Sequence, residues 1–370
     1  MTDYLNLPTA EDQKRIADAM ERLAGGSEEK VTDPTNAPGP KVLVAGNRKR
    51  GFYGFVQPWE FGEIEGNPQG RTSFDGSNLA LAIGLTAGTA QFIDTPWMKF
   101  SIDGDIAFVP LKPIRYSAPW NSIYNQGAVY GDDTIGVNPP NGRAGIRLYV
   151  DGATNSFRED SRADGDGFLK SGAVIAEVGD KIITRNFENA ANNGEFTVQS
   201  ITDSAITVSE SLVSEEKGNP KANIYNKVDA VTQSRKIRTG GNEYRVRLLK
   251  GASQDPLNSY LDADRDMVGD ANEWNTLILP MHERAKAGTW NYKAYAGEVD
   301  YWGLDLTDKD LHTHHSYGRG TYSWTQETSD DVSWTRVRRG HGGASGALQD
   351  FSWPAWNDHG WRPALLLSVS

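Results

Sequence analysis

The chain has 370 residues, enough for roughly two or three domains with real hydrophobic cores. Its formal net charge of −11 argues against general electrostatic binding to nucleic acid or to an anionic membrane. Cysteine is absent from the sequence, so disulfides, thiolate zinc sites and cysteine nucleophiles are all excluded. No apolar run approaches the ~20 residues of a membrane helix, and the polar N-terminus lacks a signal core. We therefore expect a protein made in a cytosol that inserts into no membrane.

Residues 9–24 are predicted to form a helix. Ile16, Met20 and Leu23 recur at helical spacing, and two glycines follow them. An apolar stripe of about two heptads is marginal in water, so it needs a partner. Two interpretations stay open: the helix packs on its own domain, or it docks and self-associates. With the polar, proline-containing stretch 28–41, which is typical of a linker, it makes up a predicted N-terminal region, residues 1–40.

Residues 41–150 are predicted to begin a β-rich body. The alternating runs 97–102 and 106–111 flank Asp103-Gly104, and Asp-Gly between such runs is a strong hairpin signal. Two short helices are expected as well, at residues 78–85 and 119–126.

Residues 151–230 are predicted to be a small β domain inserted into that body. Short alternating segments at 181–184, 192–201 and 205–208 are separated by turn residues, which indicates an antiparallel barrel or sandwich. Polar flanks suit insertion at an exposed loop. The body is expected to resume with a hairpin at 236–249.

The C-terminal part, from Glu273 onward, is crowded with aromatic side chains. It holds eight of the eleven tryptophans and all six histidines, with many glycines and no long apolar run. Such a sequence is typical of a loop-rich domain on a small sheet. A domain of this kind is better suited to binding than to catalysis. We therefore expect a mostly β (α+β) protein in which residues 231–370 complete the body and form this Trp-rich domain.

One acidic segment fits part of a calcium loop. Asp262, Asp264 and Asp266 occupy its first three ligand positions, and two further acids continue the pattern. Met267 stands where such a loop needs glycine, so a solvated acidic loop is the alternative. We expect no cofactor unless this segment binds calcium.

His312, His314 and His315 form a histidine cluster. On a strand, the imidazoles of His312 and His314 would point the same way and could share a transition metal. No third ligand is placed by spacing, so a chance surface triplet is the alternative. No nucleophile elbow, phosphate loop or dinucleotide fingerprint stands in a convincing context, and we expect no catalytic residues.

Exposed tryptophan and tyrosine beside polar groups are how proteins hold sugar rings. Any single tryptophan is more simply explained as core, but the set favours at least one exposed aromatic platform. The candidate receptor contacts, all expected on loops, are Trp302, His314, Tyr317, Tyr322, Trp353 and Trp356.

A set of motifs runs through the body on both sides of the predicted insert. They lie at residues 85–92, 95–100, 112–116, 127–131, 244–252, 273–275, 323–327, 337–340 and 361–363. In combination they resemble a family of virion structural proteins of tailed bacteriophages. Members of that family usually pass directly from the Gly-Ala-Val-Tyr-Gly stretch to the Tyr-Arg-Val-Arg-Leu-Leu hairpin, which agrees with an insertion here. The resemblance implies a virion component, tail-associated, and no catalytic residues.

Two fainter resemblances lie at the ends of the chain. Residues 6–11 look like the start of many tail-fibre proteins, where such helices associate near the virion. Residues 338–343 and 360–363 are similar to the end of C-type-lectin-like and formylglycine-enzyme-like folds, which phages use for receptor binding. The enzyme branch needs a copper-binding cysteine pair, which this chain lacks.

These resemblances imply a non-enzymatic tail fibre or tail-tip appendage that contributes to host attachment. Its expected partners are other virion proteins, further copies in a homotrimer, and a host-surface glycan or protein. Its expected location is the virion, after assembly in the host cytoplasm. The alternatives are a capsid-decoration or baseplate subunit and, less favoured, a polysaccharide-degrading enzyme with paired carboxylates.

Overall fold

A computed structural model of the chain shows the mostly β protein that the sequence predicts. The described residues are Lys14 and residues 31–67, 70–137, 139–140, 143–144, 147–160, 176–219, 221–257, 272–287, 299–328, 335–340, 342–352 and 355–368. Three sets of predicted residues lie outside them: the helical stripe of Ile16, Met20 and Leu23, the acidic loop of Asp262, Asp264 and Asp266, and Trp353. Within the described residues, no helix has the length and apolar character needed to cross a bilayer.

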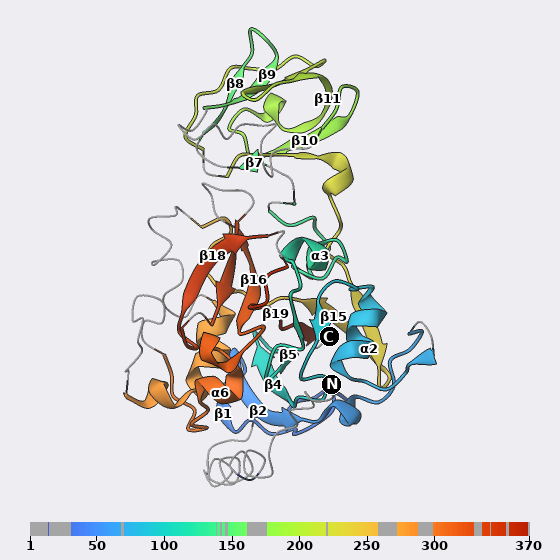
Figure 1. Ribbon diagram of the computed structural model, residues 1–370, viewed down its shortest axis with the longest axis vertical. Helices are drawn as coiled ribbons and strands as arrows, with labels where there is room; N and C mark the ends of the chain where they lie inside the picture. The colour runs from blue at the N-terminus through green and yellow to red at the C-terminus, as the bar shows by residue number, and fades with distance from the viewer. Residues whose placement is uncertain are drawn as a thin grey trace.

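An antiparallel sheet forms the centre of the body (Figure 1). Its strands, in spatial order, are β1 (Ala45–Gly46), β2 (Arg50–Val56), β4 (Trp97–Ile102), β5 (Asp105–Pro110), β20 (Ala364–Leu367), β15 (Asn242–Arg247) and β14 (Lys236–Thr239). The predicted hairpins β4–β5 and β14–β15 are both confirmed. Asp103 and Gly104 have φ of 52° and 97°, as a two-residue turn with left-handed backbone requires.

Both faces of this sheet are buried. On one face, Trp97, Phe108 and Tyr244 pack with the helices α2 (Gly76–Ile83) and α3 (Trp120–Tyr124). On the other face, Phe100 and Val109 pack with a cluster that includes the π-helix η5 (Trp274–Ile278) and the short helix α6 (Asp308–Leu311). Helices α2 and α3 confirm the two short helices predicted from sequence. The Asp75 side chain caps α2 by accepting from two backbone N–H groups.

A second sheet of the body joins distant parts of the sequence. Its order is β18 (Ala347–Phe351), β17 (Thr335–Arg339), β16 (Tyr322–Thr328), β19 (His359–Trp361), β6 (Arg115–Tyr116) and β3 (Thr89–Ala90). Strand β20 likewise lies between β5 and β15 in the central sheet. Within the described residues, the Trp-rich C-terminal segment continues the body, because it supplies strands to sheets that the first half of the body begins.

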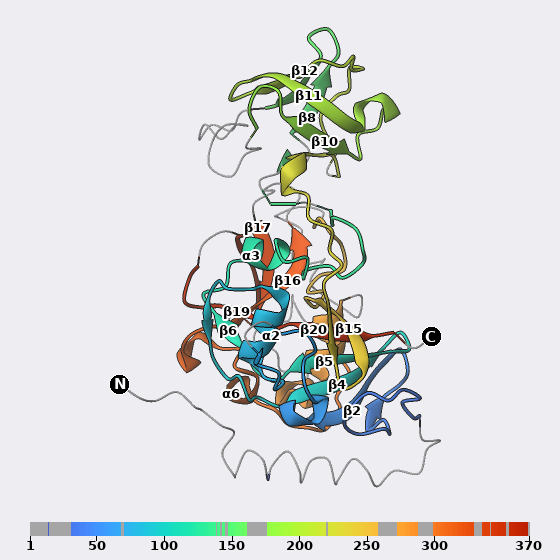
Figure 2. The same ribbon diagram turned by 90° about the vertical axis from the view of Figure 1, so that its right-hand side faces the viewer.

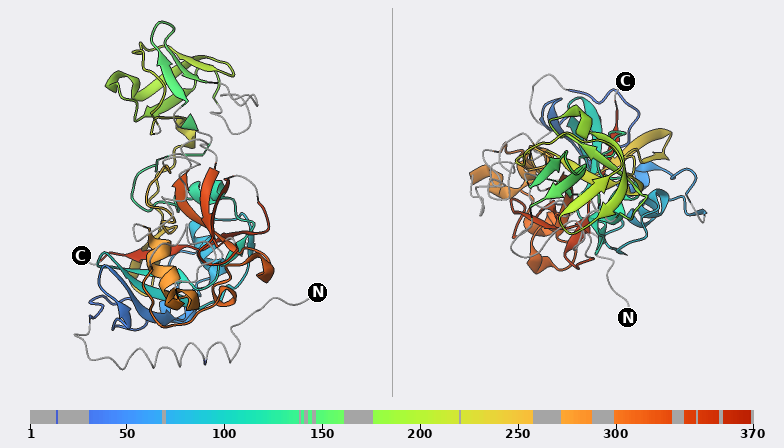
Figure 3. Two further views of the ribbon diagram at one scale, coloured as in Figure 1. Left: turned by 90° about the vertical axis from the view of Figure 1, so that its left-hand side faces the viewer. Right: turned by 90° about the horizontal axis from the view of Figure 1, so that it is seen from above.

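The inserted module, residues 143–226, has a sheet and a core of its own. Its strands, in order, are β7 (Arg143–Ala144), β13 (Asn223–Asn226), β10 (Lys181–Arg185), β11 (Gly194–Ile201), β12 (Ala205–Val208), β9 (Ser156–Glu159) and β8 (Leu148–Asp151). The predicted insertion is thus present as a structural unit, but its pairing starts before residue 151, since β7 and β8 belong to this sheet. Figures 1 and 3 show the module standing away from the body at one end.

The two ends of the insertion meet beside the body. Asp133 N donates to the carbonyl oxygen of Gln233 at 3.2 Å, and Gln233 N donates to Thr134 O at 2.6 Å. The buried Gln233 side chain accepts from Val129 N at 3.0 Å and donates to two carbonyl groups, including that of Tyr124. These bonds hold the entry and exit segments together, so the body can close its own core below the module.

The segment 31–41 is packed on the sheet, so the linker prediction is wrong for this part. The Lys99 side chain is fully buried, with Nζ 2.8 Å from Oδ2 of the equally buried Asp33. The same Nζ donates to the carbonyl oxygens of Pro38 and Pro40 at 2.9 and 2.8 Å. A buried ammonium group needs such partners, so Lys99 ties this segment to the sheet.

The remaining described helices are single turns. They are the 3-10 helices η1 (Pro58–Phe61), η3 (Ala190–Asn192), η4 (Lys227–Asp229), η6 (Leu279–Met281), η7 (Glu283–Ala287) and η8 (His315–Tyr317). Figure 2 shows strands β8, β10, β11 and β12 of the inserted module at one end of the molecule, away from β2, β4 and β5 of the central sheet.

Candidate functional site

The structure divides the predicted receptor contacts into buried and exposed side chains. Trp302 is 5 % exposed, and its ring centroid lies 6.3 Å from that of Phe52 and 6.3 Å from that of Phe100. Tyr322 is 4 % exposed on strand β16, with the Arg338 guanidinium carbon 4.1 Å from its ring centroid. Both are therefore wrong as surface contacts, and Tyr322 does not lie on a loop. Their rings fill the core instead.

Other tryptophans of the C-terminal part are also core residues. Trp274, Trp324 and Trp361 are buried. The Trp274 indole N–H donates to Ala344 O and the Trp324 indole N–H to Ala118 O, each at 2.8 Å. A buried indole needs such an acceptor, and these bonds supply it. Most of the described indoles in this part are thus explained by packing.

Three of the predicted contacts are accessible. Tyr317 is 42 % exposed and Trp356 is 46 % exposed, while His314 is half-buried. The rings of His314 and Tyr317 lie edge to face with centroids 6.0 Å apart. Trp356 lies elsewhere, near Phe351, at a centroid distance of 6.3 Å. Among the five predicted contacts that the structure describes, only Tyr317 lines a pocket.

Tyr317 is part of a hollow that we call the aromatic pocket, of about 460 Å³. Its lining residues come from β3 and the segment after it, from β6, and from the loop between α6 and β16. They are Thr89, Ala90, Gln91, Phe92, Tyr116, His312, Tyr317, Gly318 and Arg319. Aromatic faces beside hydroxyl, amide and guanidinium groups can hold a ring-shaped polar ligand.

His312 shapes the floor of the aromatic pocket. A capping box of Thr307 and Asp310 starts α6, and His312 ends it with a left-handed backbone, φ 54°. Its Nε2 lies 2.7 Å from Arg319 O, which closes the loop 312–319. Burial lowers the pKa of His312 to about 4, so the neutral ring donates its Nε2–H to that carbonyl group. Phe92, also left-handed at φ 43°, meets the imidazole edge-on at 4.7 Å.

The histidine cluster does not lie on a strand, as the metal hypothesis assumed. His312 ends a helix and His315 begins a 3-10 turn, because the capping signals around Thr307 favour a helix there. The rings of His314 and His315 stack with centroids 4.1 Å apart. In the described part of the chain, no group of three or more His, Asp or Glu is arranged to hold a metal.

Arg319 carries the charge of the aromatic pocket. Its Nη1 donates to the Tyr116 hydroxyl oxygen at 2.9 Å, and its guanidinium carbon lies 5.2 Å from the Tyr116 ring centroid. This hydrogen bond from Arg319, with a second from Thr89, lowers the pKa of Tyr116. Arg319 itself is exposed. The Tyr116 ring and one hydrogen bond thus orient a guanidinium group that forms no ion pair with a carboxylate among the described residues.

The loop reaches its strands because residue 320 is glycine. Gly320 has φ 69°, and a Cβ there would lie 2.3 Å from Gln91 Nε2 and 2.9 Å from Tyr116 Cβ. The Gln91 amide is itself held by donating to Pro113 O at 3.1 Å. A side chain at position 320 would therefore push the loop away from the opposite wall of the pocket.

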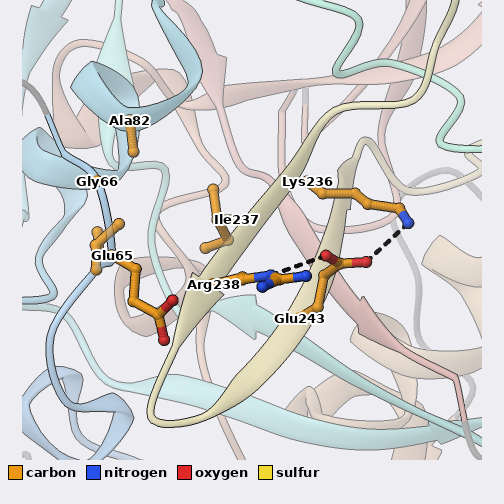
Figure 4. Close-up of a pocket in the computed structure, with 8 residues that line it drawn as sticks. Glu65, Gly66, Ala82, Lys236, Ile237, Arg238 and Glu243 are labelled. Atoms are coloured by element: carbon orange, nitrogen blue, oxygen red, sulfur yellow. Dashed lines mark hydrogen bonds and ion pairs between the residues drawn. The ribbon is translucent and has the colours of Figure 1, made fainter.

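A second hollow of about 420 Å³, which we call the polar pocket, lies beside the hairpin β14–β15 of the central sheet (Figure 4). Its lining residues are Ile64, Glu65, Gly66, Ala82, Lys236, Ile237, Arg238 and Glu243. The Glu243 carboxylate accepts from Lys236 Nζ at 2.7 Å and from Arg238 Nε at 3.1 Å, as the figure shows. The positive charges of Lys236 and Arg238 are therefore paired with a carboxylate of the protein itself.

Sequence reasoning missed Gln91, Phe92, Tyr116 and Arg319. No periodic pattern marks them, and Tyr116 and Arg319 stand 203 residues apart. A usable signal was the family resemblance, because residues 85–92 and 112–116 carry two of its motifs.

Comparison with known proteins adds no assignment. A scan against protein-family models, a search of curated proteins and a search of solved structures each found no match.

Proposed function

We propose that the protein is a non-enzymatic component of a tailed-phage virion that binds a host-surface glycan through the aromatic pocket. The observation that carries this proposal is the pocket itself, in which exposed Tyr317 lies with Phe92, Tyr116 and Arg319. Sugars offer apolar ring faces and hydroxyl groups, and this lining offers a partner for each. A tail fibre or tail tip is the location that suits such contact best, as the resemblance of the body motifs implies.

The disposition of acids favours binding over glycan hydrolysis. Burial, with the neighbouring Asp255 carboxylate, raises the pKa of Glu327 to about 8, a property that a general acid needs. Glu327 is only 2 % exposed, however, and both its oxygens accept from Gly251 N at 3.0 Å. Neither of these acids lines the aromatic or the polar pocket. A polymeric substrate therefore cannot reach the carboxyl groups of Glu327 and Asp255 through either pocket.

The polar pocket offers no better acid. Glu65 and Glu243 both line it. Hydrogen bonds from Lys236 and Arg238 lower the pKa of Glu243, so this carboxyl group stays ionised and cannot donate a proton at neutral pH.

The N-terminal region, residues 1–40, has a different role in this proposal. Its predicted helix attaches the chain to other virion proteins or to further copies, and a marginal helix gains most from trimeric symmetry. Because residues 31–41 belong to the body, the attachment device ends before them. Deleting residues 1–26 should release the protein from virions while circular dichroism and the unfolding midpoint stay unchanged; a deleted chain that fails to fold would contradict the docking role.

A purely structural subunit, such as a capsid decoration or baseplate protein, is the second candidate. The observation that favours it is that Trp274, Trp302, Trp324 and Trp361 are sealed in the core, which leaves few exposed aromatic groups. The position of the chain in an image of the intact virion separates the two: a place within the shell supports the structural role, a distal place on the tail supports attachment.

Adsorption of the purified, fluorescently labelled chain to cells that the virion infects tests the attachment proposal directly. Tyr317→Ala should abolish adsorption, because it removes an exposed platform of the aromatic pocket. The matched control is Trp59→Ala, which removes a larger exposed ring that lines neither pocket. Unchanged adsorption of the Tyr317 variant would overturn the assignment of the site, and no adsorption of the wild type would favour the structural candidate.

A further inference from the structure

The lining of the aromatic pocket is unusual in charge for this protein. The chain has 49 acidic and 38 basic residues, yet none of the lining residues is acidic. Arg319 contributes a positive charge to the lining, and Lys112 Nζ stands 5.1 Å from the Phe92 ring centroid. A hollow that carries a positive charge and no acidic side chain favours an anionic ligand, in a chain whose formal net charge is −11.

Arg319 differs from other arginines on this surface in its partners. Arg158, Arg238 and Arg245 each lie within 3.1 Å of a carboxylate oxygen. Arg319 forms no such ion pair in the described part of the chain; its side-chain hydrogen bond goes to the neutral Tyr116 hydroxyl. A guanidinium group has five N–H donors in a planar fork, so one bond to a phenol leaves most of them for a ligand.

The groups around Arg319 hold it in place without neutralising it. The Tyr116 ring lies beside its guanidinium carbon, and its own backbone oxygen is fixed by the His312 imidazole. His312 is neutral because burial, and the nearby charges of Lys112 and Arg362, lower its pKa. The His312 ring therefore positions the loop and adds no charge to the pocket. An oriented cation loses little conformational freedom on binding, which favours affinity.

We propose that the ligand of the aromatic pocket is a sugar ring that carries a carboxylate, such as a hexuronate unit of an acidic glycan. Arg319 binds the carboxylate through paired N–H donors, and Tyr317 and Phe92 cover the apolar face of the ring. This inference rests on the proposed glycan-binding function and names its substrate class. A phosphate on a sugar presents similar acceptors to a guanidinium group, so the experiment must separate the two anions.

An array of matched oligosaccharides tests the inference with the full-length chain. Each uronate, for example trigalacturonate, is printed beside its methyl ester, which keeps the ring and removes the charge; neutral oligosaccharides and sugar phosphates complete the array. We expect uronates to bind at least about tenfold more tightly than their esters, and the preference to weaken as salt is raised from about 0.05 to 0.5 M.

Variants assign the preference to Arg319. Arg319→Gln should remove the discrimination between uronate and ester, and Arg319→Lys should restore part of it, since a lysine keeps the charge without the fork. Arg238→Gln, in the polar pocket, is the matched control and should bind as the wild type does. Because Arg319 is exposed, its variants should unfold at the wild-type midpoint, which excludes misfolding as the cause.

The outcomes separate this inference from the function on which it rests. Equal binding of uronates and esters overturns the carboxylate assignment and leaves glycan binding in place. Binding confined to sugar phosphates overturns it too, in favour of a phosphorylated glycan. Discrimination that survives Arg319→Gln removes Arg319 from the site. Binding to nothing on the array contradicts the glycan-binding function itself.

Discussion

The two pockets of the body have nearly the same volume, about 460 and 420 Å³, and opposite chemistry. The aromatic pocket has rings and an arginine that has no carboxylate partner in the part of the chain that the structure describes. The polar pocket has two cations that share the carboxylate of Glu243. The difference shows that size alone does not make a binding site. What matters is whether the donors and apolar faces of the lining are already satisfied by the protein.

The contrast follows from the backbone beneath each pocket. Lys236, Arg238 and Glu243 stand on one hairpin, where Arg238 and Glu243 are direct cross-strand partners. Regular β geometry places such opposite charges within contact distance. The aromatic pocket is built largely from loops, in which Phe92 and His312 adopt left-handed conformations. Loops can present side chains without supplying their partners, which is why binding residues gather on them.

The largest expected effect concerns Gly320, which lies next to the aromatic pocket, compared with Gly66 in the polar pocket. Gly320→Ala should lower the free energy of unfolding by about 2–5 kcal/mol, because it adds left-handed strain and a clash with Gln91 and Tyr116. Gly66→Ala is the matched control: φ is 66° and no atom lies within 4 Å of its added Cβ, so only the strain of about 1–2 kcal/mol remains. Urea denaturation measures both. Equal losses would show that the loop tolerates a side chain.

A pH effect from a histidine should come from the aromatic pocket, since the polar pocket has no histidine in its lining. Burial lowers the pKa of His312 to about 4, whereas an unfolded histidine titrates near ~6.5. Between these values the unfolded chain binds the proton and the native chain does not. Its contribution to stability is therefore complete above pH ~6.5 and is lost by up to about 3 kcal/mol as the pH falls to ~4.

His312→Gln isolates this contribution, because glutamine keeps an N–H donor for Arg319 O without the titrating ring. Urea denaturation at pH 7 and at several values down to pH 4 should give the wild type a steeper fall in stability than the variant. Parallel curves for the two proteins would mean that the His312 ring is solvated.

A smaller effect is expected for the phenol that orients Arg319. Tyr116→Phe removes the acceptor of Nη1 and keeps the ring. The arginine then samples more rotamers, so the affinity for a uronate should fall by about 5- to 10-fold while the affinity for its methyl ester stays constant. Calorimetric titration of both ligands measures this. A uniform loss for the two ligands would assign Tyr116 to ring contact rather than to positioning.

The smallest effect is expected from releasing the cations of the polar pocket. Glu243→Gln removes their shared carboxylate, yet the variant should gain no second uronate site at the polar pocket, and its melting temperature should not change measurably. No aromatic ring lines this pocket, and exposed ion pairs contribute little to stability. The test therefore uses an Arg319→Gln background. Uronate binding by the double variant, with the preference over the methyl ester kept, would show that charge alone suffices and that aromatic rings are not needed.

Much of the local structure was predictable from the sequence. The hairpins β4–β5 and β14–β15, helix α2 and strands β10, β11 and β12 of the inserted module follow from alternation and from turn residues such as Asp103-Gly104. These signals act between near neighbours in the chain, and burial reinforced them. The start of the insertion was harder to predict, because the short strand β7 pairs only with β13, far along the chain.

The candidate site was predictable only in part. Tyr317 and His314 were identified as aromatic and polar residues of a loop, but Trp302 and Tyr322 have the same residue types and are buried. Composition cannot tell a platform from a core ring, because both need large apolar area. Exposure depends on which other segments pack above the ring.

The sequence by itself determined the elements: which stretches alternate, where they turn, and that no cysteine chemistry is available. Only the tertiary structure decided that the C-terminal strands complete sheets begun near the N-terminus, that Lys99 is buried against Asp33, and that Arg319 stands over Tyr116. The physical reason is the distance along the chain over which each interaction acts. Turn and strand preferences are set by neighbouring residues, whereas a buried ion pair or an unpaired guanidinium group depends on chain segments that only folding brings together.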